Sequence, residues 1–346
     1  MEMKKSLVVL GVSVAMLTAC SNAVEQVASA SSAKEQGTQK ATITATATST
    51  NVVEQKGTKL IYPDIADTTH ASNKVVDRFK AFFNAKSSAN VQGTMKFFSS
   101  KSQYHDAILG WPLTSYDAIK AMFQEYMPKW GNGRSYPTKI VGDEHSAMVF
   151  FTDTPELFGA EIRIMGSVTF SDDGKITRWV DYWDGNPWPK ELLEKNQVPP
   201  DQYPTDLGES IKQNASKKIE NISKQLNAAL SQNNAEAAAS LFAYDGVVED
   251  MTLRTQIKGS AAIKRFFQRA TASLPYGANA KIRYVVGGDQ GGGYEWGNAN
   301  SSVPRGSTAI ELNKEGKITA MTVLWDGSLM NDDALNKLVV MTIDNN

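Results

Sequence analysis

The residues with the clearest chemical potential are aspartates placed among large aromatic side chains. Asp181 lies in the stretch GKITRWVDYWDG, and a near repeat later in the chain, GKITAMTVLWDG, carries Val323 at the same place. Alternation along a strand puts Asp181 on one face with Trp179 and Trp183. The matching face of the repeat is wholly apolar, which predicts that both faces point inward. Burial raises the pKa of a carboxyl group, so Asp181 is a candidate acid or base near neutral pH.

Two further aspartates extend this hypothesis to a pair of carboxyl groups. Asp106 in YHDAIL and Asp250 in VEDMTL occupy matching places of a longer repeat. Asp106 is a candidate partner of Asp181 across a pocket, whereas Asp250 stands alone in the second copy. Another interpretation stays open: Asp106 and Asp250 cap a turn before a helix, and Asp181 points outward if its strand contains a bulge. Asp184 and Asp326, each before a glycine, are predicted turn formers.

The tryptophans are the residues most able to bind a flat ligand. Large aromatic side chains dominate burial, so most of them are expected in the core, while a few could line a pocket for a flat molecule. The candidate ligand-binding residues are Trp111, Trp179, Trp183 and Trp325.

Composition argues against several other kinds of site. The chain has 346 residues, with 36 Lys and Arg, 37 Asp and Glu, and one cysteine. The charges nearly cancel and form no basic stripe, so nucleic acid is not an expected partner. His70, His105 and His145 have no metal-ligand spacing, and neither a metal nor a cofactor is expected. The stretch GGDQGGGYEWG lacks the ending of a phosphate-binding loop and is predicted to be a flexible hairpin at a pocket rim.

The first twenty residues predict export and a lipid anchor. Lys4 and Lys5 precede the apolar run LVVLGVSVAML, which is too short to span a bilayer as a mature helix. The LTAC that follows resembles the bacterial lipobox, which implies removal of residues 1–19 and lipid attachment to Cys20. Ser21 after the cysteine points to the outer membrane, with the protein facing the periplasm. The alternative is a plain secretory signal peptide with an accidental cysteine.

The remaining chain divides into a tether and two similar halves. Residues 20–68 are rich in Ser, Thr, Ala and Gln and are predicted to be a flexible tether. Helical spacing followed by strand-like alternation occurs twice, over residues 69–190 and 212–338, with a connector at 191–211. YHDAILGWPLTSYDAIKAMF aligns with VEDMTLRTQIKGSAAIKRFF without a gap, and the terminal strands match in the same order. We therefore expect a duplicated α+β domain with helices first and antiparallel strands after them.

These motifs resemble a known superfamily. FAYDGVVEDMTLRTQIKGSAAIKRFF is similar to a segment of the ketosteroid-isomerase and SnoaL-like group, and GKIT followed by WDG is similar to the last hairpin of the same nuclear-transport-factor-2-like superfamily. The resemblance implies a cone-shaped, cystatin-like fold in each half, in which a curved antiparallel sheet packs on about three N-terminal helices. It also implies a pocket between sheet and helices, a natural place for a small hydrophobic molecule.

The resemblance implies roles for the aspartates and also argues against one reaction. In ketosteroid isomerases the aspartate that matches Asp106 and Asp250 is the general base. The positions of that family's two oxyanion donors hold none of the required side chains here: Phe82, Leu226, Gly166 and Thr308. Steroid isomerisation is therefore not expected. SnoaL-like polyketide cyclases carry an aspartate in the last strand, at the place of Asp181.

Two functional hypotheses follow from the sequence. The first is a membrane-anchored periplasmic lipoprotein that binds a small apolar or aromatic molecule, with isomerase, cyclase or hydrolase chemistry through Asp106 and Asp181. The second is a non-catalytic interaction or scaffold protein whose cones are filled by side chains. In either case the two halves form a pseudo-dimer within one chain or take part in a homo-oligomer.

Overall fold

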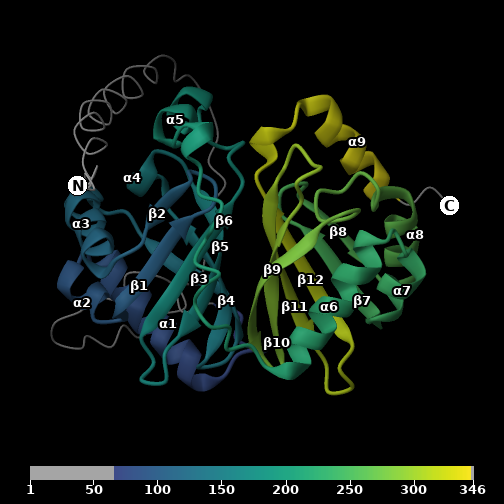
Figure 1. Cartoon of the computed structure of the whole chain (residues 1–346), viewed down its shortest axis with the longest axis horizontal. Coiled ribbons are helices and arrows are strands. Elements are labelled where there is room, and N and C mark those ends of the chain that lie inside the picture. The colour runs from purple at the N-terminus through teal and green to yellow at the C-terminus, as the bar shows by residue number, and fades with distance from the viewer. Residues whose placement is uncertain (1–65, 344–346) are drawn as a thin grey trace, which may run out of the picture. The chain divides into compact units, whose positions relative to one another are not determined.

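The first half of the chain places three helices on one face of a sheet. The computed structural model describes residues 66–343. We call the elements from α1 to β6 domain 1, and Figure 1 shows α1, α2 and α3 on the side of its sheet that faces away from the second half. In chain order the elements are α1 (Asn73–Ser87), α2 (Val91–Met95), β1 (Phe98–Asp106), β2 (Trp111–Leu113), α3 (Tyr116–Tyr126), η1 (Met127–Lys129), β3 (Ser135–Gly142), β4 (Ser146–Asp153), α4 (Pro155–Phe158), β5 (Ile162–Phe170) and β6 (Ile176–Trp183).

The second half repeats this order after a connecting segment. The segment contains α5 (Lys190–Asn196) and η2 (Pro200–Gln202). We call the elements from α6 to the last helix domain 2: α6 (Lys217–Ser231), α7 (Ala235–Ser240), β7 (Phe242–Asp250), β8 (Thr255–Lys258), α8 (Ser260–Ala270), β9 (Lys281–Gly288), β10 (Gly291–Gly297), β11 (Arg305–Leu312), β12 (Ile318–Trp325), η3 (Gly327–Leu329) and α9 (Asp332–Thr342).

Capping residues explain where the main helices begin. Ser72, Ser115 and Ser216 precede α1, α3 and α6, and each side chain accepts a hydrogen bond from the backbone N–H three residues later. Each helix then turns an apolar face toward its sheet. In α1 the buried members of that face include Val75, Phe79, Phe82 and Phe83.

Both sheets have six strands in the same order. The order is β2-β1-β6-β5-β4-β3 in domain 1 and β8-β7-β12-β11-β10-β9 in domain 2. Neighbouring strands are antiparallel, except that β1 pairs in parallel with β6 and β7 with β12. The predicted α+β class and the duplicated cystatin-like fold are confirmed, and the parallel pair is an addition to the antiparallel sheet expected from the sequence.

Four elements differ from the sequence prediction. β1 and β2 stand between α2 and α3, so the helices do not all precede the strands. The sequence hides β1 because its register shifts between Phe98 and Gln103, which interrupts the alternation of apolar and polar residues. α5 lies inside the predicted connector, and α9 runs past residue 338, where the sequence prediction ended the second domain.

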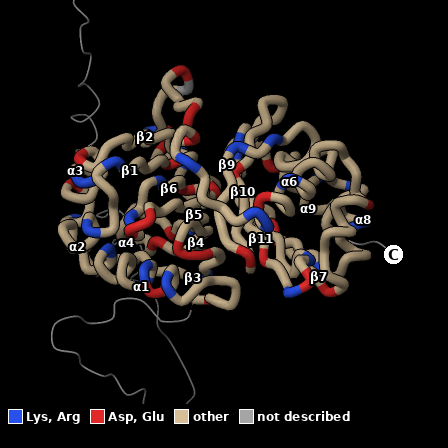
Figure 2. The backbone as a smooth tube through the Cα atoms, turned by 60° about the horizontal axis from the view of Figure 1, so that its bottom comes forward, with Lys and Arg blue, Asp and Glu red and all other residues tan. Residues whose placement is uncertain are grey.

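The two sheets contact each other through the faces that their helices leave open. All described residues belong to one compact unit. Figure 1 shows the sheets side by side, and Figure 2 shows Lys and Arg interspersed with Asp and Glu over the described chain. Four buried side chains from each domain form a separate apolar cluster between the sheets: Val141, Met148, Phe150, Met165, Tyr284, Val286, Ala309 and Leu324.

The glycine-rich stretch belongs to this contact, so its predicted place at a pocket rim is wrong. It forms the end of β9 and all of β10. A Cβ added at Gly291 would lie 2.7 Å from Val141 of domain 1, and one added at Gly293 would lie 2.8 Å from Met148. The missing side chains let the hairpin approach the other domain closely.

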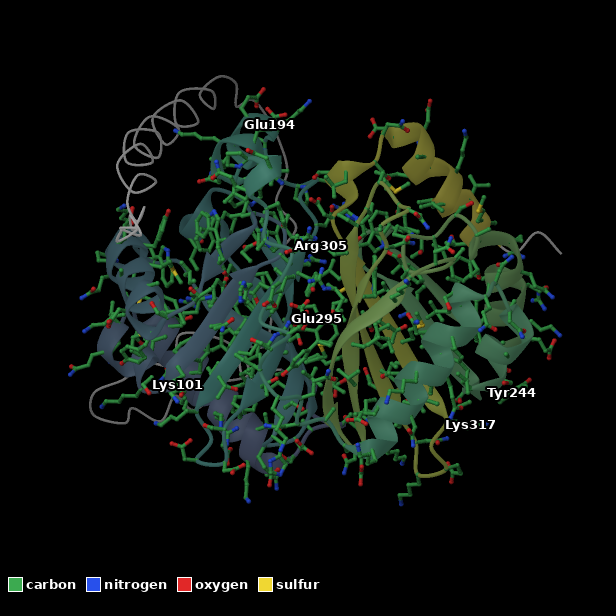
Figure 3. The ribbon with its side chains drawn as sticks, viewed as in Figure 1. Lys101, Glu194, Tyr244, Glu295, Arg305 and Lys317 are labelled. Carbon is green, nitrogen blue, oxygen red and sulfur yellow. The ribbon has the colours of Figure 1, made fainter. Side chains whose placement is uncertain are left out.

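One fully buried ion pair crosses the contact between the sheets. Arg178 Nη1 and Nη2 donate to the two carboxylate oxygens of Glu295 at 2.5 and 2.8 Å. The Tyr182 hydroxyl also donates to Glu295, at 2.9 Å, and the guanidinium lies 3.9 Å from the ring centroid of Tyr284. Burial alone would raise the pKa of Glu295, but the charge of Arg178 holds it below its usual value. Figure 3 places Glu295 between the two halves.

Asp184 and Asp326 connect the domains reciprocally. Asp184 Oδ1 accepts a hydrogen bond from the backbone N–H of Gly327, and Asp326 Oδ1 accepts one from Gly185, each at 3.0 Å. Each aspartate also accepts the backbone N–H two residues further along its own chain segment, the turn-forming contact predicted from the sequence. The last strands of the two domains therefore end in one pair of equivalent contacts.

Candidate functional site

A polar cluster lies inside domain 1, between its first and last strands. The Tyr104 hydroxyl donates to Asp181 Oδ2 at 2.7 Å, and Trp179 Nε1 donates to Asp181 Oδ1 at 2.5 Å. The parallel register of β1 and β6 pairs Tyr104 with Trp179. Two residues further along both strands, the register pairs Asp106 with Asp181, on the same face of the sheet. Trp179 and Trp183 belong to the core beneath the helices, so this face of β6 points inward as the alternation predicted.

The environment of Asp181 brings the pKa of its carboxyl group close to neutral pH. Burial raises the pKa of Asp181 to about 7, against the hydrogen bonds from Tyr104 and Trp179 and the positive charge of Lys86. The carboxylate of Asp106 adds to the rise. Asp181 is therefore present in both protonation states at neutral pH, so it can donate or accept a proton. Its hydrogen-bond partners among the described residues are side chains, so it caps neither a turn nor a helix.

Gly166 provides space for this cluster. It pairs with Asp181 across β5 and β6. A Cβ at Gly166 would lie 2.9 Å from Trp179 Nε1 and 3.1 Å from Asp181 Oδ1. The position where the family resemblance would place an oxyanion donor therefore carries no side chain, because the contact between Trp179 and Asp181 occupies that space.

Domain 2 has apolar residues at the places of the polar cluster. The parallel register of β7 and β12 gives the three counterparts as Val248, Met321 and Val323. All three are 0% exposed. The polar cluster therefore occurs in only one of the two copies.

Asp106 makes another set of contacts, and Asp250 repeats it. Asp106 Oδ1 accepts the backbone N–H groups two and three residues later, at 2.9 and 2.8 Å, and Trp183 Nε1 donates to the same carboxylate. Asp250 Oδ1 accepts the corresponding N–H groups at 3.0 and 2.9 Å, and Trp325 Nε1 donates to it. Burial raises the pKa of both aspartates to about 6. Both carboxylates thus hold the turn that follows the first strand of their sheet.

The structure brings some predicted site residues together and separates others. Four meet inside domain 1: Asp106, Asp181, Trp179 and Trp183. Two meet inside domain 2: Asp250 and Trp325. Trp111 lies on β2, where its indole N–H donates to the backbone oxygen of Asn196 at 2.8 Å. Cys20 lies outside the described residues.

The cluster in domain 1 keeps a small exposed surface that domain 2 lacks. Asp181 is 6% exposed, Asp106 is 8% exposed, and Tyr104 is partly exposed. Asp250 and Val323 are 0% exposed. Four phenylalanine rings pack around the indole of Trp179. Access to Asp181 therefore requires side chains to move.

Sequence reasoning missed Tyr104 and Lys86. Tyr104 stands two residues before Asp106, so alternation along one strand could have placed both on the inward face. Lys86 Nζ lies 3.2 Å from Asp153 Oδ1, and both side chains are largely buried. The counterpart of Lys86 in α6 is Leu230, an apolar residue on the buried face of that helix. A comparison of the two copies therefore gives no indication of an ion pair at this position.

Two hollows of the described surface lie away from this cluster. One, of about 590 Å³, is lined by residues of α9, and the other, of about 430 Å³, by α6 and the start of β9. Both are shallow. Within residues 66–343, no group of three or more His, Cys, Asp or Glu side chains is placed to hold a metal ion. No helix in that range is long and apolar enough to cross a membrane.

Comparison with known proteins gives one family match. Residues 79–179 match the family described as SnoaL-like domain. The matched range runs from α1 into β6 and includes Tyr104, Asp106 and Trp179. No curated protein matches the chain.

Several solved structures are weakly similar to this chain. A SnoaL-like protein of unknown function from Burkholderia thailandensis is 9% identical, covers 33% of this chain and 98% of its own, and has a TM-score of 0.29. A steroid delta-isomerase from Pseudomonas aeruginosa is 9% identical, with coverages of 38% and 93% and a TM-score of 0.30. A cystatin-like protein of unknown function from Methylobium petroleophilum is 12% identical, with coverages of 33% and 78% and a TM-score of 0.29. Similarities at this level say nothing about activity.

Proposed function

The chain contains a SnoaL-like domain over residues 79–179, and from that premise we propose that domain 1 binds a small apolar or aromatic molecule through Asp181. The observation that carries the proposal is the hydrogen-bonded cluster of Tyr104, Asp181 and Trp179. Burying a carboxyl group costs free energy, and domain 2 fills the same place with Val323. A fold that needed only a packed interior could use apolar residues in both copies.

Asp181 is suited to move a proton within a bound molecule. With its pKa raised to about 7 by burial, the acid form can donate to a ligand oxygen and the carboxylate can accept a proton from a neighbouring carbon or hydroxyl. Tyr104 stabilises the carboxylate between these steps. Isomerisation and cyclisation both require such a transfer, so these are the reactions we propose for domain 1. Asp106 acts as a positioning residue, because its carboxylate is engaged by the turn that follows it.

We propose that domain 2 supports domain 1 rather than binding a ligand of its own. Its interior lacks the polar cluster, and its sheet carries half of the apolar cluster between the domains. We also propose that Cys20 carries a lipid and that the protein is held at the outer membrane, facing the periplasm. Labelling with a tagged fatty acid tests the anchor, because Cys20→Ala should abolish the label and move the protein to the soluble fraction.

Two probes of similar shape test the ligand proposal. Isothermal titration calorimetry on the full chain compares 1-naphthol, which has one hydroxyl, with naphthalene, which has none. A net hydrogen bond contributes about 1 kcal/mol, so 1-naphthol should bind about five to ten times more tightly. Asp181→Val copies domain 2 and should remove that preference. Val323→Thr changes the matched place in domain 2 and should leave it intact. Equal preference in wild type and Asp181→Val would contradict the proposal.

The packed interior favours one second candidate, a non-catalytic interaction or scaffold protein. Four phenylalanine rings surround Trp179, and the two shallow hollows described above lie elsewhere on the surface. Absence of binding by either probe, together with no change in melting temperature at saturating probe, would favour this candidate.

A further inference from the structure

A largely buried ion pair lies inside domain 1. Lys86 Nζ, on α1, donates to the two carboxylate oxygens of Asp153, on β4, at 3.2 and 3.3 Å. The two side chains are 11% and 5% exposed. Three aromatic rings face the ammonium group, with centroids 5.9, 6.0 and 4.8 Å from Nζ: Phe83, Trp130 and Phe151. Because little water reaches this place, the charge of Lys86 is screened far less than a charge at the surface.

The same aromatic rings connect this ion pair to the polar cluster. Phe83 and Phe151 also pack on the indole of Trp179, with ring centroids 6.3 and 6.0 Å apart. That indole donates its N–H to Asp181 at 2.5 Å. One group of rings therefore contacts both the ammonium group of Lys86 and the indole that binds Asp181.

Domain 2 has uncharged residues at all three ionisable positions. The helix starts and the strand registers give the counterparts of Lys86, Asp153 and Asp181 as Leu230, Asn298 and Val323. Leu230 and Val323 are 0% exposed. The amide of Asn298 donates to two backbone oxygens of its own domain, at 2.9 and 3.0 Å. Burying a charge is costly even when it is paired, and domain 2 forms the same fold without it. The three ionisable groups therefore occur as a set, in one copy.

The ionisable groups around Asp181 come from three other elements. Tyr104 and Asp106 lie on β1, Lys86 lies on α1, and Asp153 lies on β4. Burial raises the pKa of Asp181, the charge of Lys86 opposes that rise, and the carboxylate of Asp106 adds to it. Burial and the nearby carboxylates, that of Asp153 included, raise the pKa of Tyr104. Lys86 supplies the positive charge of this group.

We infer that Lys86 is a positioning residue for the proton transfer proposed for domain 1: its charge favours the carboxylate form of Asp181, and Asp153 fixes where that charge lies. This inference rests on the proposed role of Asp181. An opposite charge stabilises the ionised form of a carboxyl group, most strongly where water is excluded. Without Lys86, burial would keep Asp181 mainly protonated at neutral pH, so that it could donate a proton but rarely accept one. Lys86 therefore keeps the acid and the base form available together.

An NMR titration of the aspartate carboxyl carbons tests this role without a ligand. The full chain carries Cys20→Ala, which prevents lipid attachment, and Asp181→Asn identifies the signal of Asp181 by its loss. Lys86→Leu combined with Asp153→Asn installs the residues of domain 2 and removes both charges of the pair. We expect this double variant to raise the ratio of acid to carboxylate at Asp181 at least about threefold at neutral pH, because the nearer charge of the pair is lost.

The single variant Asp153→Asn should act in the opposite direction. It keeps Lys86 and removes the negative charge that offsets it, so the ratio of acid to carboxylate at Asp181 should fall at least about threefold. A purely structural role of the ion pair predicts no such reversal. If the double variant does not fold, Asp153→Asn decides alone, and a ratio that does not fall overturns the inference.

Two control variants separate charge from packing. Lys86→Arg keeps the positive charge and should leave the ratio at Asp181 within about twofold of wild type. Lys74→Leu removes a lysine of the same helix whose side chain is 77% exposed, and it should leave the ratio unchanged. An unchanged ratio in the double variant, or equal shifts in the double variant and Asp153→Asn, would overturn the inference even if Asp181→Val abolishes the probe preference. If the ratios shift as expected but Asp181→Val leaves that preference intact, Lys86 controls the protonation of Asp181 and the proposed ligand role of Asp181 fails.

Discussion

The last strands of the two domains share a framework and differ in what they carry. Trp183 and Trp325 occupy matching places, and each donates its indole N–H to the aspartate that holds the neighbouring turn. Two residues earlier, Asp181 and Val323 also match, but only Asp181 has polar partners. Contacts present in both copies are sufficient to specify the fold. A contact that is present in one copy alone is therefore not required by the fold. Such contacts are the candidates for a functional role or for a role in joining the two domains.

The contact between the sheets also combines interactions that occur in both copies with interactions that occur once. The hydrogen bonds of Asp184 and Asp326 are reciprocal, whereas the ion pair of Arg178 with Glu295 occurs once. The strand registers give the counterparts of these two residues in the other domain. Ala320 of domain 2 corresponds to Arg178, and Phe150 of domain 1 corresponds to Glu295. One side of the interface therefore has a fully buried ion pair, whereas the other has apolar residues at those two positions and a partly exposed ion pair, Lys139 with Glu311 at 2.7 Å, beside them.

The largest expected effect comes from breaking this single ion pair. Arg178→Ala leaves Glu295 fully buried without its charge partner. We expect a loss of about 3–5 kcal/mol in the free energy of unfolding, since an uncompensated buried charge is costly. Urea unfolding followed by circular dichroism measures it. Arg163→Ala removes an exposed arginine of the same domain and should leave the unfolding midpoint unchanged.

A double variant separates the ion pair from the geometry of the interface. Arg178→Ala combined with Glu295→Phe installs the residues that stand on the other side, Ala320 and Phe150. This variant should recover at least half of the lost stability, because replacing a buried pair by apolar groups is often nearly neutral. A double variant as unstable as Arg178→Ala would mean that the two sides of the interface are not interchangeable.

The second prediction compares the aspartates that the copies share. Asp106→Ala and Asp250→Ala each leave two backbone N–H groups and one indole N–H without their acceptor. Each should lower the free energy of unfolding by about 2–4 kcal/mol, and the two losses should agree within about 1 kcal/mol. Thermal and urea unfolding of both variants test this. A much smaller loss for Asp106→Ala would contradict its assignment as a positioning residue and return it to the candidate catalytic groups.

Much of the fold could be predicted from the sequence because two copies support each other. The last four strands of each domain follow from the strand-like alternation that occurs in both halves of the sequence. β1 could not be found because its middle, SSKS, is polar and its register shifts. α5 lies in a stretch rich in proline and charge, where no apolar stripe defines a helix.

The candidate site could be predicted only in part. The mismatch between Asp181 and Val323 is visible in the sequence and leads directly to the polar cluster. Tyr104 is not visible in the same way, because its contact with Asp181 joins residues 77 positions apart through a parallel strand pair. The burial of Arg178 could not be predicted either. Alternation places its side chain on the outer face of the sheet, and the sequence does not show that a second sheet buries this face.

The third prediction tests the acidity that separates Asp181 from Val323. Burial raises the pKa of Asp181 from 3.8 to about 7, so its folded state binds a proton more tightly than its unfolded state. The stability that this proton provides is complete below about pH 4 and is lost as the pH rises through 7. Asp181→Asn has no such proton, so the stability of the variant relative to wild type should increase between pH 4 and pH 8, by up to about 4 kcal/mol. Val323→Asn changes no titrating group and should shift stability by an amount independent of pH.

The smallest expected effect concerns the reciprocal contacts at the ends of the last strands. Burial raises the pKa of Asp184 to about 6, so at pH 5 it is largely protonated and Asp184→Asn is a close copy of it. The pKa of Asp326 is raised by burial as well. An amide oxygen can still accept the glycine N–H, so Asp184→Asn and Asp326→Asn should each cost less than about 1 kcal/mol at pH 5 and should agree with each other. Unequal costs in urea unfolding would show that one domain depends on this contact more than the other. Equal costs beside a large effect at Arg178 would mean that the duplicated contacts align the domains, while the fully buried pair of Arg178 with Glu295 contributes more to the strength of their association.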